Sequence, residues 1–231
     1  LLVFSLGSLI SEGLIVMEHF DVIIVGAGIS GVSAAVHLGR ECPDQSYCVL
    51  ERRENVGGTW DLFKYPGIRS DSDMHTLGFN FKPWKESKSI ADGPAILQYV
   101  KETTQEYGID EKIKFSHKLT NAQWSSSDAN WTLDVDHAGT QVQISCNFLF
   151  MCSGYYSHDE VHDPRIDGVE KFAGQVINPQ FWPKDLQHKG KRVVVVGSGA
   201  TAMTLVPNMA AGGAQVTQRT RLKTRRRRPR L

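Results

Sequence analysis

The sequence predicts an α/β protein built around two parallel βαβ units, and three observations support this. Two apolar runs, residues 20–25 and 193–196, each lead into a glycine-rich turn. A helical pattern follows each turn. Between the two units lie short segments of alternating apolar and polar residues, which are typical of an antiparallel meander. The 231 residues exceed one ordinary domain and can bury a sizeable core.

Composition is that of a globular chain, with 41% hydrophobic and 22% charged residues. The net charge of +1 hides an asymmetry, because residues 219–231 hold eight of the 26 Lys and Arg and no acidic residue. The other 18 basic and 25 acidic residues leave residues 1–218 with a net charge of −7. The four cysteines form no CxxC pair, and neither they nor His75 and His117 recur at a metal-site spacing. We therefore expect no metal and a reducing, cytoplasmic location.

The first glycine-rich turn, GAGISG at residues 26–31, matches a dinucleotide-binding fingerprint. Gly26 makes the tight turn out of the strand, Gly28 lets a pyrophosphate approach the backbone, and Gly31 lets the next helix pack closely on the sheet. The helix predicted at residues 29–40 would point its N-terminal amides and its dipole at the phosphates.

A second strand, predicted at residues 46–50, and Glu51 complete this fingerprint. Glu51 lies twenty residues beyond Gly31, where a carboxylate accepts hydrogen bonds from an adenosine ribose. A βαβ turn with a purely structural role is the alternative. Strand, helix, second strand and acidic residue all fall where the fingerprint needs them, which favours a Rossmann-type dinucleotide-binding unit.

The middle of the chain predicts one long loop followed by a mostly β region. Residues 52–84 carry few strand signals, and a loop of this length is usually functional. In it, Gly57-Gly58 can adopt positive φ and turn Thr59-Trp60 toward a cofactor. The elements expected next are a helix at 94–107, strands at 113–119, 121–124, 131–136 and 140–144, of which the last three form a meander, and a buried strand at 148–152.

A second fingerprint, GSGATA at residues 197–202, follows the buried strand predicted at residues 193–196. A helix is expected at residues 201–209, where Pro207 would shorten or kink it. Arg219 lies 22 residues after the first glycine of this turn, where a cation meets the 2′-phosphate of NADP. A role for Arg219 unrelated to the cofactor is the alternative. Two fingerprints separated by a meander imply FAD at the first and NAD(P)H at the second.

The motifs GAGISG, GGTWDLF, KYPGIRSDSDMHTLGFNFKPW, CSGYY and GSGATA together resemble the flavin-dependent Baeyer–Villiger monooxygenases. The resemblance covers about residues 19–218 and is closest to the branch with the mycobacterial ethionamide-activating enzyme. The family fingerprint F-x-G-x-x-x-H-x-x-x-W-P reads from Phe172 to Pro183, with Asn178 in place of the histidine. Asparagine keeps a donor and an acceptor but does not titrate near neutral pH.

The resemblance implies a Rossmann-type FAD-binding domain with a β-meander, followed by the start of a second Rossmann-type, NADP-binding domain. Fingerprint and resemblance together assign to FAD binding Gly26, Gly28, Ser30, Gly31, Glu51, Gly58, Thr59, Trp60, Asp61, Leu62, Arg69, Ser70, Asp71 and Leu119. They assign to NADP binding Gly197, Ser198, Gly199, Ala200, Thr201, Ala202, Gln218 and Arg219.

The activity implied by the resemblance is a monooxygenase reaction. NADPH would reduce FAD, and the C4a-peroxyflavin formed with O₂ would insert oxygen into a ketone or oxidise a sulfide. Asp71 is the catalytic candidate, expected to be buried and unpaired, because no residue matches the family's catalytic arginine. The alternative is a truncated, inactive fragment that at most binds FAD. We expect no nucleic-acid partner and no integral membrane span.

Four segments are expected along the chain. They are an upstream or leader segment at 1–16 ahead of Met17, an FAD-binding domain at 17–158, a linker and partial NADP-binding domain at 159–218, and a basic, non-native tail at 219–231. The tail is interpreted as an out-of-frame or truncated end, with a basic tail for nucleic acid or a membrane surface as the alternative.

Overall fold

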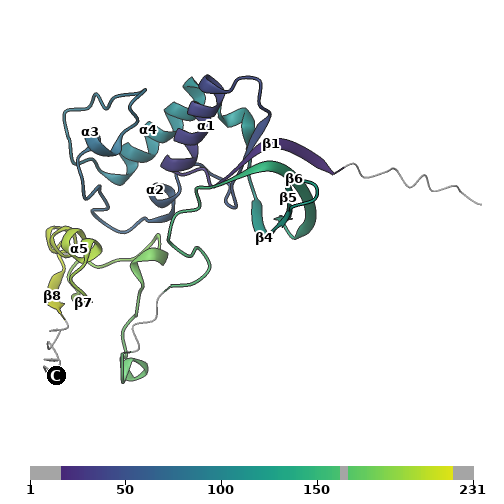
Figure 1. The fold of residues 1–231 in the computed structure, drawn as a ribbon. Helices are drawn as coiled ribbons and strands as arrows, with labels where there is room; N and C mark the ends of the chain where they lie inside the picture. The colour runs from purple at the N-terminus through teal and green to yellow at the C-terminus, as the bar shows by residue number, and fades with distance from the viewer. Residues whose placement is uncertain (1–16, 162–165, 221–231) are drawn as a thin grey trace, which may run out of the picture.

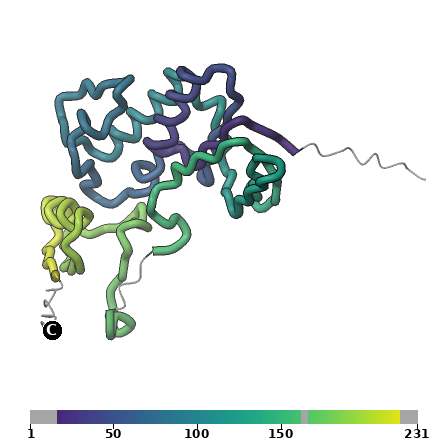
Figure 2. The backbone as a smooth tube through the Cα atoms, viewed as in Figure 1, coloured from purple at the N-terminus to yellow at the C-terminus, as the bar shows by residue number. Residues whose placement is uncertain are grey.

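The computed structural model of the chain describes residues 17–161 and 166–220. It shows a larger N-terminal unit and a smaller C-terminal unit (Figure 1), and residues 166–191 lead into the C-terminal unit with little regular structure (Figure 2). The N-terminal unit starts with β1 (Glu18–Val25), α1 (Ile29–Glu41) and β2 (Tyr47–Leu50), and the C-terminal unit consists of β7 (Arg192–Val196), α5 (Ala200–Ala211) and β8 (Gln215–Arg219). In both, the two strands run parallel, which confirms the predicted α/β class and its two βαβ units.

Other elements surround the first βαβ. They are α2 (Thr59–Leu62), α3 (Met74–Leu77), α4 (Gly93–Glu106), β3 (Ile113–Lys114), β4 (His117–Ser125), β5 (Asn130–His137) and β6 (Thr140–Met151). Short 3₁₀ turns lie at Asp110–Lys112, Val169–Lys171 and Pro179–Phe181. The loop predicted at residues 52–84 therefore contains two single-turn helices and no strand.

The six strands of the N-terminal unit form one mixed sheet in the order β3-β2-β1-β6-β5-β4. One face of β1 packs through Ile24 against α1 and α4, where Val36 and Ile96 belong to the same cluster. The other face packs through Ile23 against Leu133 of the meander. The central strand is thus buried from both sides, as its continuous apolar run predicts.

The strand expected at residues 113–119 is two strands. Lys114 ends β3, which pairs in parallel with β2, whereas His117 begins β4, which pairs antiparallel with β5. Between them Ser116 has a φ of 56° and donates its backbone N–H to the carbonyl of Arg53. The prediction of a single strand was wrong because the chain changes its pairing partner here, from β2 to β5, through a left-handed residue.

The strands expected at residues 140–144 and 148–152 are one strand, β6. Its first half pairs with β5 up to Cys146, and its second half pairs with β1 alone. Beyond Cys146 the meander no longer follows it, and Phe148 is 59% exposed, with Phe150 also exposed. The expectation of a buried strand was therefore wrong for this half, because no described segment covers that face.

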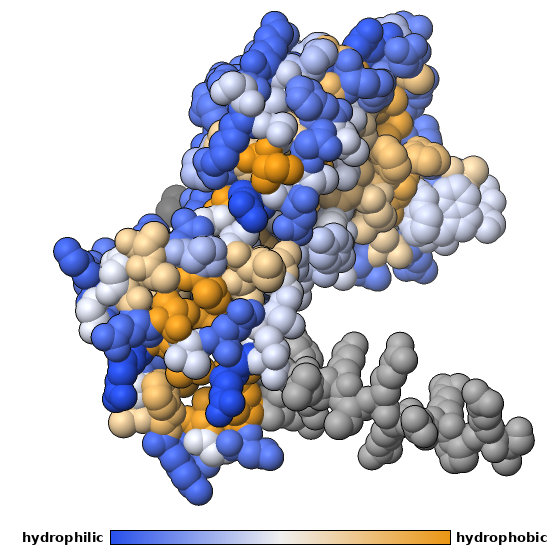
Figure 3. Space-filling view, turned by 90° about the vertical axis from the view of Figure 1, so that its left-hand side faces the viewer, coloured by the Kyte–Doolittle hydropathy of each residue, from blue (hydrophilic) through white to orange (hydrophobic). Residues whose placement is uncertain are grey.

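The C-terminal unit differs from its prediction in burial and in extent. Its strands form a two-stranded sheet that α5 covers on one side, so Val194 and Val196 are 58% and 62% exposed rather than buried. Apolar residues are visible on the surface of this unit (Figure 3). Pro207 lies within α5 without ending it. β8 includes Arg219, the first residue of the segment predicted to be a tail; residues 221–231 and 1–16 lie outside the described ranges.

The two units meet through an apolar cluster. Phe63 and Tyr65, which follow α2, pack against Leu205 and Met209 of α5. Gly67 has a φ of 81°, and a Cβ there would lie 2.0 Å from Asn208 Nδ2, so the loop backbone approaches the helix closely. This contact brings the N-terminus of α5 to the first unit. Among the described helices, none is long and apolar enough to cross a membrane.

Candidate functional site

The turn between β1 and α1 has the geometry that its glycines predict. Gly26 has a φ of 103°, and a Cβ there would lie 2.6 Å from the carbonyl oxygen of Cys152. A Cβ on Gly31 would lie 1.8 Å from the carbonyl oxygen of Gly26, so only glycine lets α1 pack on this turn. A Cβ on Gly28 would make only an ordinary contact, 3.6 Å from Gly58. Protein packing therefore does not explain Gly28, which leaves its backbone free for a ligand to approach.

The N-terminus of α1 is open to an anion. Gly28 is the N-cap, no side chain caps the helix, and its first turn carries no acidic residue. The first amides of a helix have no partner within it, and they carry a partial positive charge. The residues present here fit a pyrophosphate group.

Glu51 is 4% exposed and lies at the end of β2. Its Oε2 accepts a hydrogen bond of 2.8 Å from the Ala27 N–H, and its Oε1 accepts one of 2.9 Å from the Arg53 N–H. These bonds hold the carboxylate rigidly beside the glycine turn. Each oxygen keeps a further lone pair, so Glu51 can still accept hydrogen bonds from ribose hydroxyls.

The GGTW segment is held by an ion pair. Gly57 and Gly58 have φ values of 116° and 52°, and the Gly57 N–H donates to the Ala27 carbonyl at 2.9 Å. Arg53 Nη2 lies 2.7 Å from Asp61 Oδ2. Asp61 is buried, and this oxygen has no hydrogen bond of good geometry in the described structure, so the contact with Arg53 is mainly ionic. Asp61 thus anchors α2 through its ion pair with Arg53.

These features surround a cavity of about 800 Å³. Residues from both fingerprints line it, because the docking of α5 brings the second turn to the first unit. The predicted site residues on its wall are Gly26, Gly28, Ser30, Glu51, Gly58, Thr59, Trp60, Arg69, Asp71, Leu119, Ala200 and Thr201. Those away from its wall are Gly31, Asp61, Leu62, Ser70, Gly197, Ser198, Gly199, Ala202, Gln218 and Arg219.

Several residues away from the wall have a structural contact instead. Ser70 Oγ accepts a hydrogen bond from the Ala91 N–H at 3.1 Å, and Leu62 packs in the cluster between the two units. Gln218 Nε2 donates to the Gly197 carbonyl at 2.9 Å. Arg219 is exposed at the end of β8. In this structure these side chains do not reach the cavity wall.

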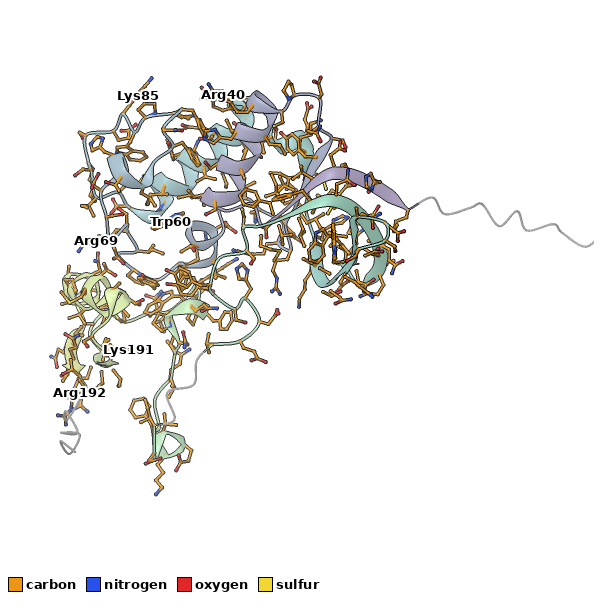
Figure 4. The ribbon with its side chains drawn as sticks, viewed as in Figure 1. Arg40, Trp60, Arg69, Lys85, Lys191 and Arg192 are labelled. Atoms are coloured by element: carbon orange, nitrogen blue, oxygen red, sulfur yellow. The ribbon has the colours of Figure 1, made fainter. Side chains whose placement is uncertain are left out.

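Trp60, Arg69 and Asp71 are among the residues that line the cavity. Trp60 belongs to α2, and Arg69 projects from the following loop beside the C-terminal unit (Figure 4). Asp71 is exposed, which corrects the expectation of a buried carboxylate. Asp71 is exposed because it lies in an irregular loop that no described segment covers.

Another wall of the cavity is formed by a segment to which the sequence motifs assign no site residue. We call residues 153–159, which follow β6, the strap. Its Tyr156 ring packs edge-on against Phe63 with centroids 4.9 Å apart. Burial, and then the neighbouring Tyr155, raise the pKa of Tyr156 to about 12, so its hydroxyl stays protonated. The CSGYY motif was the available signal, but it was used only to identify the family.

Four cationic or potentially cationic residues on the wall were also missed, among them His117 at the start of β4. Arg52 follows Glu51, Lys118 precedes Leu119, and His158 lies in the strap. Burial, followed by the charges of Arg52 and Arg53, lowers the pKa of His158, which favours its neutral form. Its buried Nδ1 has no hydrogen-bond partner among the described residues.

Asn178 has a local role that a histidine would not fill in the same way. Its Oδ1 accepts a hydrogen bond of 3.0 Å from the Gln180 N–H and so caps the 3₁₀ turn at Pro179–Phe181. Gln180 Nε2 in turn donates to the carbonyl of Ser157 in the strap. The substituted fingerprint residue therefore connects the linker to the wall of the cavity.

The buried cysteines and the possible metal ligands among the described residues form no second site. Cys48 and Cys146 are buried, and burial raises the pKa of their thiols to about 12 and about 11. Both belong to the apolar cluster beneath the sheet. The described ranges hold no group of three His, Cys, Asp or Glu residues that could bind a metal ion.

Comparison with known proteins identifies relatives along most of the chain. Residues 20–225 match the family described as flavin-binding monooxygenase-like. The FAD-containing monooxygenase EthA of Mycolicibacterium smegmatis is 59% identical over 197 residues, which are 85% of this chain and 40% of that protein. The probable FAD-binding monooxygenase AlmA of Acinetobacter baylyi is 47% identical over 199 residues, which are 86% of this chain and 40% of that protein.

A solved structure described as oxidized steroid monooxygenase bound to NADP has a TM-score of 0.75 and 29% identity, and the match covers 87% of this chain and 38% of that one. The chain thus spans about 40% of the length of the curated relatives it matches. The sequence and structural matches extend over both βαβ units. The chain belongs to the flavin-binding monooxygenase-like family, as its resemblance to the Baeyer–Villiger monooxygenases predicts.

Proposed function

We propose that this chain supplies the FAD site and the first part of the NADPH site of a monooxygenase of Baeyer–Villiger type, which oxidises ketones or sulfides with O₂. The observation that carries the proposal is a single cavity lined by the first glycine turn, by Glu51 and by the N-terminus of α5. One cavity bordered by both fingerprints is what hydride transfer between two dinucleotides requires.

Each wall of the cavity has a distinct part in this proposal. The open amides of α1 bind the pyrophosphate of FAD, and Glu51 accepts hydrogen bonds from its ribose. Thr59 and Trp60 line the end where the flavin ring lies. Bound FAD would supply the two-electron and oxygen chemistry, while the protein positions it.

The second cofactor would lie on the C-terminal unit. The N-cap Gly199 of α5 carries no capping side chain, and Ala200 and Thr201 of its first turn line the cavity. These residues fit the pyrophosphate of NADPH for the same electrostatic reason as in the first unit. Arg219, at the end of β8, is the cation proposed for the 2′-phosphate.

The test of FAD binding is a titration of the full 231-residue chain, followed by quenching of flavin fluorescence. We expect Glu51→Gln to weaken binding about 10- to 100-fold, the range for one lost hydrogen bond to a charged group. Glu54→Gln, an exposed neighbour, is the matched control and should leave affinity unchanged. A folded wild-type protein that takes up no FAD would overturn the proposal.

A second candidate is that this chain taken alone binds FAD without turning over. The exposure of Val194 and Val196 favours it, because the described part of the NADPH-binding unit has one uncovered sheet face. The test supplies FAD, NADPH, O₂ and a panel of ketones and sulfides. Ester or sulfoxide formed in step with NADPH consumption would reject the binding-only role. The cytoplasmic location inferred from the cysteines stays a prediction.

A further inference from the structure

The strap ends in a carboxylate that bridges two cations from different parts of the sheet. Asp159 forms ion pairs with Arg52, which follows β2, and with Lys118 of β4. The Lys118 Nζ to Asp159 Oδ2 distance is 3.0 Å, and Arg52 Nη2 donates to Asp159 Oδ1. These two contacts attach the far end of the strap to the N-terminal sheet.

The two cations lie beside the residues assigned to the adenosine end of FAD. Arg52 is next to Glu51 in the chain, and Lys118 is next to Leu119, and all four line the cavity. His158, which precedes Asp159, lines the same cavity, and its buried Nδ1 has no hydrogen-bond partner in the described structure. Asp159 itself lies off the wall. Its ion pairs therefore anchor the strap next to His158, whose side chain lines the cavity.

We propose that Asp159 is a positioning residue that latches the strap over the adenosine end of the cavity and so slows the escape of bound FAD. This inference rests on the proposed FAD binding. Hydrogen bonds from Arg52, and then from Lys118, lower the pKa of Asp159 to about 2, so the latch stays charged near neutral pH. The strap is further held by the Gln180 hydrogen bond to Ser157 and by the packing of Tyr156 on Phe63.

A latch and simple electrostatics predict opposite effects of removing Asp159 on the binding of FAD. Without Asp159, Arg52 and Lys118 become uncompensated positive charges on the wall of a cavity that takes an anionic ligand. If the strap had no effect on the ligand, removing Asp159 would therefore strengthen FAD binding and speed its association. If the strap is a latch, removing Asp159 speeds dissociation.

The experiment measures FAD dissociation from the full chain by stopped-flow fluorescence. All three residues are partly exposed, so we expect Asp159→Asn to speed dissociation by only about three- to tenfold, as for a small network of exposed ion pairs. Asp159→Glu should restore the slow rate. Glu160→Gln is the matched control, because Glu160 is exposed and forms no salt bridge with a described residue.

Three further readouts separate a latch from a general structural role. Lys118→Gln should have little added effect on the rate of FAD dissociation in the Asp159→Asn background. The melting temperature of the FAD-free protein should be the same for wild type and Asp159→Asn, and ADP should show the same rate ratio as FAD.

Each of three results would overturn the latch, its location at the adenosine end, or the proposed function. Wild type that binds FAD, with Asp159→Asn dissociating at the same rate or more slowly, overturns the latch and leaves the proposed function standing. A rate ratio seen with FAD but not with ADP overturns the location at the adenosine end. Wild type that binds neither FAD nor ADP overturns the proposed function and the latch together.

Discussion

The glycine turns of the two βαβ units have a similar backbone and very different surroundings. The N-cap glycines Gly28 and Gly199 have φ, ψ values of −80°, −171° and −79°, −177°. The opening glycines Gly26 and Gly197 both have positive φ, 103° and 138°. Yet a Cβ on Gly26 would collide with Cys152, whereas a Cβ on Gly197 would meet no described atom within 4 Å.

The comparison shows that the fingerprint residues specify the turn, whereas other parts of the fold enclose it. Six residues of similar pattern form the same turn in both units, because glycine conformation and helix capping are local. The first turn is enclosed by β6, the GGTW segment and the strap. Around the two glycines of the second turn, Gly197 and Gly199, a Cβ would meet no described atom within 4 Å. A complete binding cradle therefore depends on distant segments that the fingerprint does not contain.

The largest expected effect is that of Gly31→Ala. The new Cβ would lie 1.8 Å from the Gly26 carbonyl oxygen, which is backbone and cannot rotate away. We expect a loss of at least about 4 kcal/mol in the free energy of unfolding, the range that marks a severe clash. Urea unfolding followed by circular dichroism measures it, and near-normal stability would contradict the close packing of this turn.

Gly39→Ala, in the same helix, is the control for Gly31→Ala. Its Cβ would make an ordinary contact, 3.5 Å from the Tyr47 hydroxyl. Because alanine favours a helix interior, we expect it to stabilise the protein by about 0.5–1 kcal/mol. In the second unit the third fingerprint position is already alanine, Ala202, which shows that this turn tolerates the methyl group.

The next largest effect on the free energy of unfolding is expected at one of two matched strand positions in the two units. Ile23 of β1 and Val194 of β7 each lie three residues before the opening glycine, but Ile23 is 0% exposed and Val194 is 58% exposed. We expect Ile23→Ala to cost about 2–5 kcal/mol, the range for a large-to-small change in a core. Val194→Ala should stay within about 0.5 kcal/mol. Equal costs in urea unfolding would show that the face of β7 is covered in solution.

A smaller effect is expected at Asn178, in the linker between the two units. Asn178→Ala removes the cap on the Gln180 N–H and should cost about 1 kcal/mol locally, as for other N-caps. The readout is faster amide hydrogen exchange at residues 178–181, with β1 unchanged. Asn178→Asp keeps the acceptor and should retain protection. Unchanged exchange in Asn178→Ala would remove the capping role.

The last expected effect is a pH dependence of stability that comes from His158. Burial lowers the pKa of His158 below the ordinary value of 6.5, so below that pH the unfolded chain binds the proton more readily than the folded one. Stability is therefore lost as the pH falls through 6.5 toward the folded pKa. We expect the melting temperature of wild type to drop more on acidification than that of His158→Gln. His75→Gln, at an exposed position, should behave like wild type.

Much of the N-terminal unit could be predicted from the sequence because its signals are local. The predicted helix at residues 29–40 is α1, Ile29–Glu41, and the helix at 94–107 is α4, Gly93–Glu106. The errors occur where distant pairing decides the result. Residues 113–119 divide into β3 and β4 because the strand changes partners at Ser116, and no periodicity reports that change.

In the candidate site, too, local features could be predicted and contacts between distant segments could not. The sequence by itself determined the two glycine turns, the position of Glu51 after β2 and the family, because these depend on residue type and short spacing. Only the tertiary structure decided that both turns border one cavity, because that depends on α5 packing against Phe63 and Tyr65. It also decided that Asp61 anchors α2, that Asp71 is exposed, and that the strap forms a wall, since burial and ion pairing arise between segments far apart in the chain.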